Sequence, residues 1–225
     1  MANPLFDNLF GIHAVKATPF LHLSGGATLT HHGFLETAAQ MAHMMHGLGL
    51  KTGDRVAAQI EKSPEALALY AACVQSGLVF LPLNTAYTAD ELDYFVEDSQ
   101  ASLLICDARK EAKVLPIAKR HSAQVETLNA DGSGSLMDTA RTLPTSFETV
   151  DRNEDDLAAL LYTSGTTGRS KGAMLSHENL LSNAITLAKA WHFTKTDVLL
   201  HALPIFHTHG LFVATNVSLI ARSEE

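Results

Sequence analysis

The amino-acid sequence predicts an α/β fold with largely parallel sheets and flanking helices. Three observations lead to this prediction: short apolar runs alternate with segments of helical periodicity, glycine or proline separates most of them, and the 225-residue chain is 46% hydrophobic. Strands separated by helices are typical of parallel sheets. A chain of this size can bury a substantial core, as one large domain or two small ones.

The first half of the chain has the clearest element boundaries. Thr30 is a candidate N-cap, Ser63-Pro64 combines a cap residue with a proline at the first helical position, and Thr88 and Glu91 have the spacing of a capping box. The expected elements are a helix over 34–48, a strand over 55–60, a helix over 64–75, a strand over 79–83, a helix over 88–98, a strand over 103–106 and a helix over 111–120.

The second half continues the alternation after a loop over 131–135, whose glycine and serine composition suggests flexibility. Here we expect strands over 157–162, 173–176 and 198–202, and a helix over 179–191.

Composition narrows the classes of function. The formal charge is −8, from 16 Lys plus Arg against 24 Asp plus Glu, which argues against nucleic acid and anionic membrane as main partners. Cys73 and Cys106 lie in apolar runs and are expected to be buried free thiols, which suits a reducing cytoplasm. We find no secretory signal and no apolar run of about 18 residues that would span a membrane. The 12 histidines occur partly in pairs without nearby cysteine, so we expect no metal site.

The loop over 162–172 (YTSGTTGRSKG) carries the strongest functional signal. Its glycines allow close backbone approach to a ligand, its hydroxyls can donate to phosphate oxygens, and Lys171 adds a compact positive charge. A plain Ser/Thr/Gly surface loop is the alternative reading. A Walker-type loop fits poorly, because Lys171 follows Ser170 and precedes Gly172, and because a strand rather than a helix is expected next.

Residues 163–172 (TSGTTGRSKG) resemble the phosphate-binding loop of the adenylate-forming, or AMP-binding, superfamily, which includes acyl-CoA synthetases, firefly-type luciferases and peptide-synthetase adenylation domains. Many members have proline where this chain has Ser170. A second motif, 203–210 (LPIFHTHG), resembles the superfamily's next conserved segment, and supporting blocks stand in the expected order at 51–56, 82–87 and 155–158. Within the superfamily, 206–212 and 84–88 look most like malonyl-CoA synthetases.

The resemblance implies an acid–thiol ligase: a carboxylate attacks the α-phosphorus of ATP to give an acyl-adenylate and pyrophosphate, and coenzyme A then displaces AMP. The expected partners are therefore a small carboxylic acid, ATP and coenzyme A. The match places His207 near the acyl carboxylate, although a histidine packed against an aromatic neighbour is the alternative reading. It places a set of loop residues around the β- and γ-phosphates: Thr163, Ser164, Gly165, Thr166, Thr167, Gly168 and Lys171.

The same resemblance implies parts that cannot be assigned within these 225 residues: a Glu that holds Mg²⁺, an Asp that binds the ribose, and a catalytic Lys on a C-terminal domain. We therefore expect residues 1–225 to be an incomplete N-terminal AMP-binding domain, the front portion of the large domain, inactive alone and without the C-terminal domain. The alternatives are a non-catalytic nucleotide-binding fragment or pseudoenzyme, and an acyl-CoA synthetase for another acid. The sequence does not predict an oligomeric state.

Overall fold

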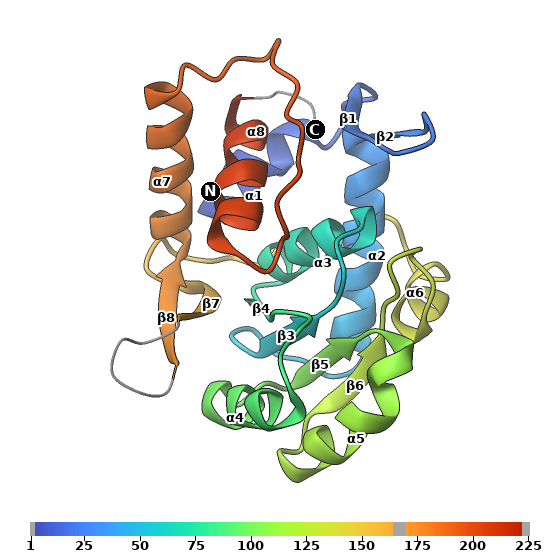
Figure 1. Cartoon of the computed structure of the whole chain (residues 1–225). Coiled ribbons are helices and arrows are strands. Elements are labelled where there is room, and N and C mark those ends of the chain that lie inside the picture. The colour runs from blue at the N-terminus through green and yellow to red at the C-terminus, as the bar shows by residue number, and fades with distance from the viewer. Residues whose placement is uncertain (1–2, 164–169, 222–225) are drawn as a thin grey trace.

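The computed structural model describes residues 3–163 and 170–221. Its main sheet has the strand order β6-β5-β3-β4-β7-β8, and a separate hairpin pairs β1 with β2 (Figure 1). The strands are β1 (Pro19–His22), β2 (Thr28–Thr30), β3 (Arg55–Gln59), β4 (Val79–Pro82), β5 (Leu103–Cys106), β6 (Gln124–Thr127), β7 (Leu157–Thr163) and β8 (Lys171–Ser176).

Most of the main sheet is parallel, which confirms the predicted fold class. Strand β3 pairs in parallel with both β4 and β5, β5 pairs in parallel with β6, and β4 with β7. In the main sheet, as far as the described residues form it, the β7–β8 pair is the one antiparallel pair. The edge strand β6 has no counterpart among the predicted strands.

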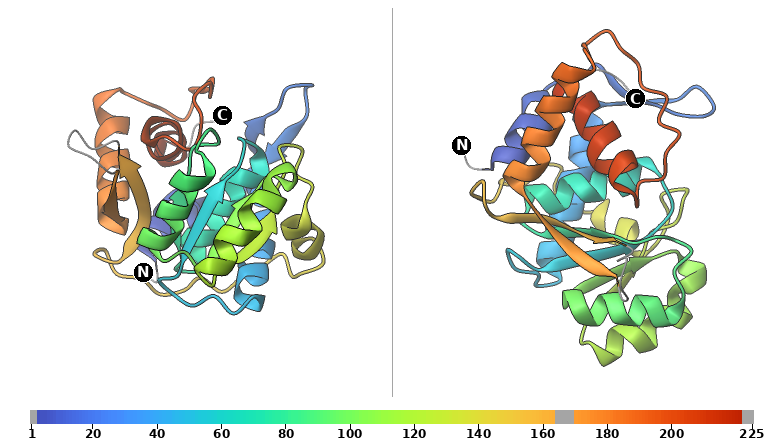
Figure 2. Two further views of the ribbon diagram at one scale, coloured as in Figure 1. Left: turned by 60° about the horizontal axis from the view of Figure 1, so that its bottom comes forward. Right: turned by 60° about the vertical axis from the view of Figure 1, so that its left-hand side comes forward.

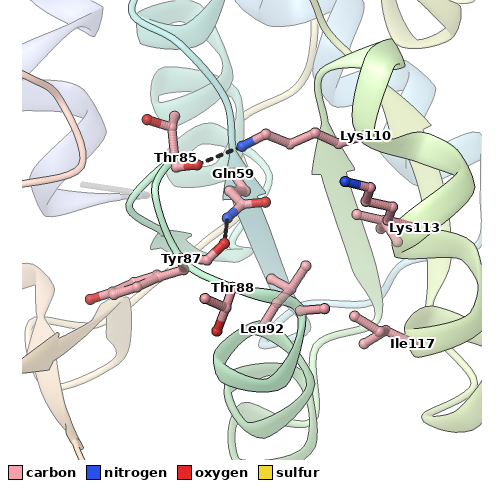
Figure 3. Close-up of a pocket in the computed structure, with 10 residues that line it drawn as sticks. Gln59, Thr85, Tyr87, Thr88, Leu92, Lys110, Lys113 and Ile117 are labelled. Carbon is pink, nitrogen blue, oxygen red and sulfur yellow. Dashed lines mark hydrogen bonds between the residues drawn. The ribbon is translucent and has the colours of Figure 1, made fainter.

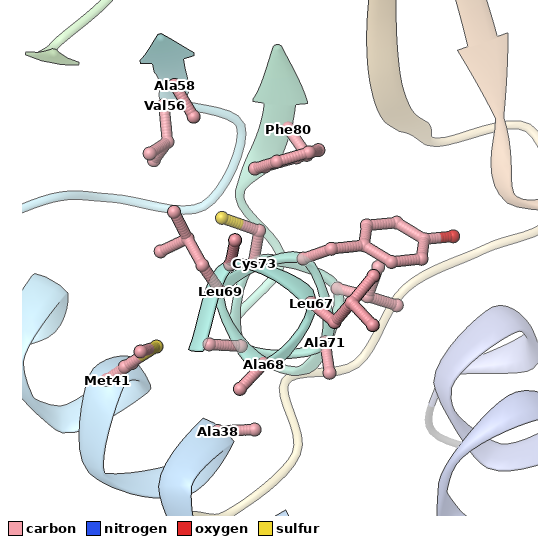
Figure 4. Packing of buried hydrophobic residues seen from close by; sticks show 14 of the residues in the cluster. Ala38, Met41, Val56, Ala58, Leu67, Ala68, Leu69, Ala71, Cys73 and Phe80 are labelled. Atoms are coloured by element: carbon pink, nitrogen blue, oxygen red, sulfur yellow. The ribbon is translucent and has the colours of Figure 1, made fainter. Parts of the chain in front are cut away.

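Helices cover both faces of the parallel strands (Figure 2). Alternate strand residues face opposite layers: Val56 and Ala58 belong to the core beneath α2 (His31–Gly47) and α3 (Pro64–Gln75), as Figure 4 shows. Ala57 belongs to the core beneath α4 (Ala89–Ser99) and α5 (Glu111–Arg120). This period of two is what a strand buried on both faces requires.

The helix starts follow the cap residues. Thr30, Ser63 and Thr88 each accept a hydrogen bond from a backbone N–H in the first turn, and Thr88 with Glu91 forms the full capping box. Helix α5 has the bounds expected from the sequence, and α2 begins at His31, three residues earlier than expected. The loop over 131–135 ends in α6 (Ser135–Ala140), which was not predicted.

A second group of helices packs beside the sheet's β7–β8 end (Figure 1). It comprises α1 (Pro4–Leu9), α7 (His177–Ala190), the π-helical turn η3 (His209–Thr215) and α8 (Asn216–Ala221), while short 3-10 turns η1 (Gly11–His13) and η2 (Ala108–Lys110) connect other elements.

The prediction of a strand over 198–202 is wrong. Val198 makes a single isolated bridge, and the segment otherwise has no regular structure. Val198 and Leu200 are 65% and 90% exposed, and no neighbouring strand of the main sheet in residues 3–163 or 170–221 lies along the segment. An apolar run does not form a strand without a partner for its backbone groups.

Cys73 and Cys106 are buried free thiols, as predicted. Across the described part of the chain, no helix is both long enough and apolar enough to cross a membrane.

Candidate functional site

The candidate site is built on the β7–β8 hairpin. The two strands pair from Leu157 opposite Ser176 to Thr163 opposite Lys171, so the chain leaves the sheet at Thr163 and returns at Lys171. This is the strand–loop–strand arrangement that the sequence predicts in place of a Walker loop. Thr163 and Lys171 are both exposed at the end of the hairpin that leads into the connecting loop. They therefore face each other across the base of the predicted phosphate loop.

The remaining residues assigned to the phosphates, Ser164, Gly165, Thr166, Thr167 and Gly168, lie outside the described residues. Their assignment stays a prediction.

The second motif (203–210) folds into a tight turn that leads into η3. The backbone N–H groups of Gly210 and Leu211 both donate to the carbonyl oxygen of His207, at 3.1 and 3.0 Å. A Cβ atom on Gly210 would lie 2.1 Å from the carbonyl oxygen of Pro204, closer than any contact allows. Only glycine fits this position, so the motif's final residue is required by the close approach of two backbone segments.

His207 itself is exposed, and its ring lies 4.6 Å from that of Phe206. Its neighbour His209 borders a cavity of about 430 Å³ between β8, α7 and the second motif, together with Leu175, Asn183 and Trp191. The turn thus leaves His207 exposed to solvent and places His209 at a partly apolar cavity. The assignment of His207 to the acyl carboxylate stays a prediction.

Two residues that sequence reasoning missed hold the second motif in place. The Lys62 ammonium donates to the carbonyl oxygens of His201 and Leu203, at 2.6 and 3.1 Å. The His201 Nε2 lies 2.7 Å from the carbonyl oxygen of Gly210, so Nε2 carries the proton and donates. Burial is the main cause that lowers the pKa of His201, which keeps its ring neutral. No local sequence signal could have revealed these contacts, because Lys62 lies about 140 residues before the segment that it binds.

A second cavity, of about 260 Å³, lies where the crossover connections of the sheet diverge (Figure 3). Strand β3 has β4 on one side and β5 on the other, which makes their carboxyl ends a topological switch point. The side-chain amide of buried Gln59 donates to the carbonyl oxygens of Asn84 and Tyr87, both at 3.1 Å, and Lys110 donates to that of Thr85 at 2.6 Å. These side chains fix the 84–87 loop that leads into α4.

The described residues contain no group of three or more His, Cys, Asp or Glu side chains that could hold a metal ion.

Comparisons with known proteins give a consistent picture. A family model described as AMP-binding enzyme matches residues 13–224. The oxalate–CoA ligase of Arabidopsis thaliana is 31% identical over 95% of this chain and 43% of its own length, and the malonate–CoA ligase of the same plant is 33% identical over 79% and 29%.

Among solved structures, apo MatB from Rhodopseudomonas palustris matches with 51% identity and a TM-score of 0.96, over 100% of this chain and 44% of that one. The ATP-bound form of the same protein matches with 52% identity and the same TM-score. The chain thus spans less than half the length of these relatives.

Proposed function

The chain belongs to the AMP-binding enzyme family, and on that premise we propose that it carries the nucleotide-handling part of an ATP-dependent acid–CoA ligase whose acid is malonate. The observation that carries this proposal is the β7–β8 hairpin, which presents Thr163 opposite Lys171 at the mouth of a glycine-rich loop. The similarity to an ATP-bound structure at 52% identity over the whole chain supports ATP as the nucleotide.

In the proposed reaction, the protein must bring a carboxylate anion up to a polyphosphate anion. Lys171 and the hydroxyl and amide donors of the phosphate loop offset this repulsion at the β- and γ-phosphates. We assign His207 to the side of the site that receives the acyl carboxylate, because the second motif, 203–210, resembles the family segment that lines that side.

The identity of the acid is a separate part of the proposal. The names of the matched relatives specify different acids, among them oxalate and malonate, so family membership alone does not fix the acid. The block over 206–212, with its two histidines, favours malonate.

We further propose that the chain is the front of the N-terminal AMP-binding domain and that its 225 residues alone do not complete the reaction. The Mg²⁺ ligand, the ribose contact and the catalytic lysine would then come from the part of the relatives that this chain does not cover. The buried free thiols of Cys73 and Cys106 suit a reducing cytoplasm, where we place the protein.

The test is a panel of acids, namely malonate, methylmalonate, oxalate, acetate and octanoate, supplied with ATP, Mg²⁺ and coenzyme A to the protein that carries this chain at full natural length. We expect AMP release to be most efficient with malonate or methylmalonate. A higher kcat/KM for octanoate would overturn the malonate assignment and keep the ligase. No acid-dependent ATP–pyrophosphate exchange with any acid would overturn the ligase and favour a non-catalytic nucleotide-binding protein.

A further inference from the structure

One face of α4 contacts both ends of the phosphate loop. The Tyr94 hydroxyl donates to the carbonyl oxygen of Ser170, at 2.8 Å, and the Tyr162 hydroxyl donates to the Asp98 carboxylate, at 2.6 Å. Tyr94 and Asp98 are four residues apart and so share a face of the helix. Ser170 directly precedes Lys171, and Tyr162 directly precedes Thr163. The helix is therefore bonded to the chain on each side of the loop.

Aromatic packing fixes the direction of these hydroxyls. The Tyr162 ring centroid lies 4.5 Å from that of Phe95 and 6.2 Å from that of Tyr94, in an edge-on arrangement with the latter. Across the strand pair, Tyr162 stands opposite Gly172, and a Cβ atom at Gly172 would lie 3.4 Å from the tyrosine ring. The absence of a side chain at Gly172 leaves the ring room to lie over β8.

The helix is itself a rigid support. Its inner face is buried in the sheet core through Leu92, Phe95 and Val96, and its first turn is closed by the capping box. Gln59 and Lys110 hold the loop that leads into it. Burial is the first cause that raises the pKa of Tyr162, so its hydroxyl keeps the proton that it donates to Asp98.

We propose that Tyr94 and Asp98 are positioning residues that hold Ser170 and Tyr162, which flank the phosphate loop, in place, so that Lys171 is held where it meets the phosphates. This inference rests on the proposed function of the loop. In this role Tyr94 acts through the backbone of Ser170, and Asp98 acts through the Tyr162 hydroxyl.

Of the two bonds, that of Tyr94 is the more important. It is partly buried and holds a backbone group one residue from Lys171, whereas the bond between Tyr162 and Asp98 is exposed and competes with water. Net hydrogen-bond contributions fall with exposure to solvent.

The test uses Tyr94→Phe, which removes only the hydroxyl and keeps the ring. The matched control is Tyr87→Phe. The Tyr87 ring packs on Phe95, 4.8 Å away, in the same aromatic group, and its hydroxyl makes no hydrogen bond to the described residues 162–163 and 170–172. In the full-length protein we expect Tyr94→Phe to raise the KM for ATP in ATP–pyrophosphate exchange about 3- to 10-fold, with the KM for the acid unchanged, the loss expected for one net hydrogen bond. Asp98→Asn should give a smaller rise and Tyr87→Phe none.

Hydrogen–deuterium exchange gives a second readout that needs no activity. The amides of 170–172 should exchange faster in Tyr94→Phe than in the wild type or in Tyr87→Phe, at an unchanged unfolding midpoint. If wild-type ATP–pyrophosphate exchange is present while Tyr94→Phe matches wild type in both the KM for ATP and amide exchange, the positioning role is wrong. A wild type without exchange activity would instead overturn the proposed function, and faster amide exchange in Tyr94→Phe would still support the structural role of the bond.

Discussion

The parallel strands and the β7–β8 hairpin belong to one sheet but are stabilised differently. All four residues of β5 are buried, because helices cover both faces of the sheet there. In β8 the first four of six residues are exposed, and Met174 is 70% exposed. Among the described residues, the proposed chemistry thus lies where the sheet is least covered and where a few side chains, rather than a core, hold the backbone. Removal of core volume and removal of single contacts should therefore affect the two regions differently.

The largest effect should come from the core of the parallel region. Leu69 in α3 is fully buried beneath the strands (Figure 4), so Leu69→Ala should lower the free energy of unfolding by about 2–5 kcal/mol. The matched change in the hairpin, Met174→Ala, should stay within about 0.5 kcal/mol. Urea unfolding followed by circular dichroism measures both. If both variants lost the same free energy of unfolding, β8 would be covered in solution, and the contrast between the parallel strands and the β7–β8 hairpin would be wrong.

The same contrast explains how much of the fold the sequence predicts. Strand β5 and helix α5 were predicted with their observed bounds, because burial on both faces of the strand and clear helix boundaries each leave a local pattern. Strand β6 was missed because three of its four residues are polar and the first three are at least partly exposed at the sheet edge. Residues 198–202 were wrongly assigned to a strand because apolar composition says nothing about whether a partner strand is present.

For the site, the sequence predicted the strand–loop–strand arrangement, but it placed Thr163 and Lys171 in the loop, whereas Thr163 is the last residue of β7 and Lys171 the first of β8. It could not reveal Tyr94, whose contact with Ser170 joins residues 76 positions apart, or Lys62, whose contact is longer still. Contacts of this kind follow from the three-dimensional fold and leave no pattern within a short window of sequence.

The next largest effect should come from removing the positive charge of Lys171 in the hairpin. Lys171→Ala in the full-length protein should cost about 1.5–3 kcal/mol in ATP–pyrophosphate exchange, the loss of one charge-assisted phosphate contact, with little change in stability. Lys119→Ala makes the same charge change on the exposed side of α5 and should leave the exchange rate unaltered. Steady-state exchange kinetics measure both, and unchanged kinetics in Lys171→Ala would remove the lysine from the phosphate site.

The smallest expected effect is a pH dependence of stability at His177, where the exposed strand β8 meets α7. His177 follows β8 directly and begins α7, yet it is only 1% exposed. Burial first, and then the positive charge of Arg152, lowers its pKa from 6.5 to about 4, while Asp156 acts in the opposite direction. His31, at the start of α2 in the well-covered region, has its pKa lowered to about 4 as well, mainly by burial. We infer that the exposure of the hairpin stops abruptly at the first residue of α7.

A histidine whose folded pKa lies below its unfolded value binds its proton more readily in the unfolded chain. Its contribution to stability is therefore complete above about pH 6.5 and is lost as the pH falls towards 4. Between pH 7.5 and 6.0, the stability advantage of wild type over His177→Gln should shrink by about 0.8 kcal/mol, and that over His31→Gln by a similar amount. Comparing each variant with wild type at both pH values cancels the titration of the carboxylates. If the stability difference between wild type and His177→Gln stayed constant between the two pH values while that for His31→Gln shrank, water would reach the start of α7. The exposed region would then extend beyond β8 into the helix.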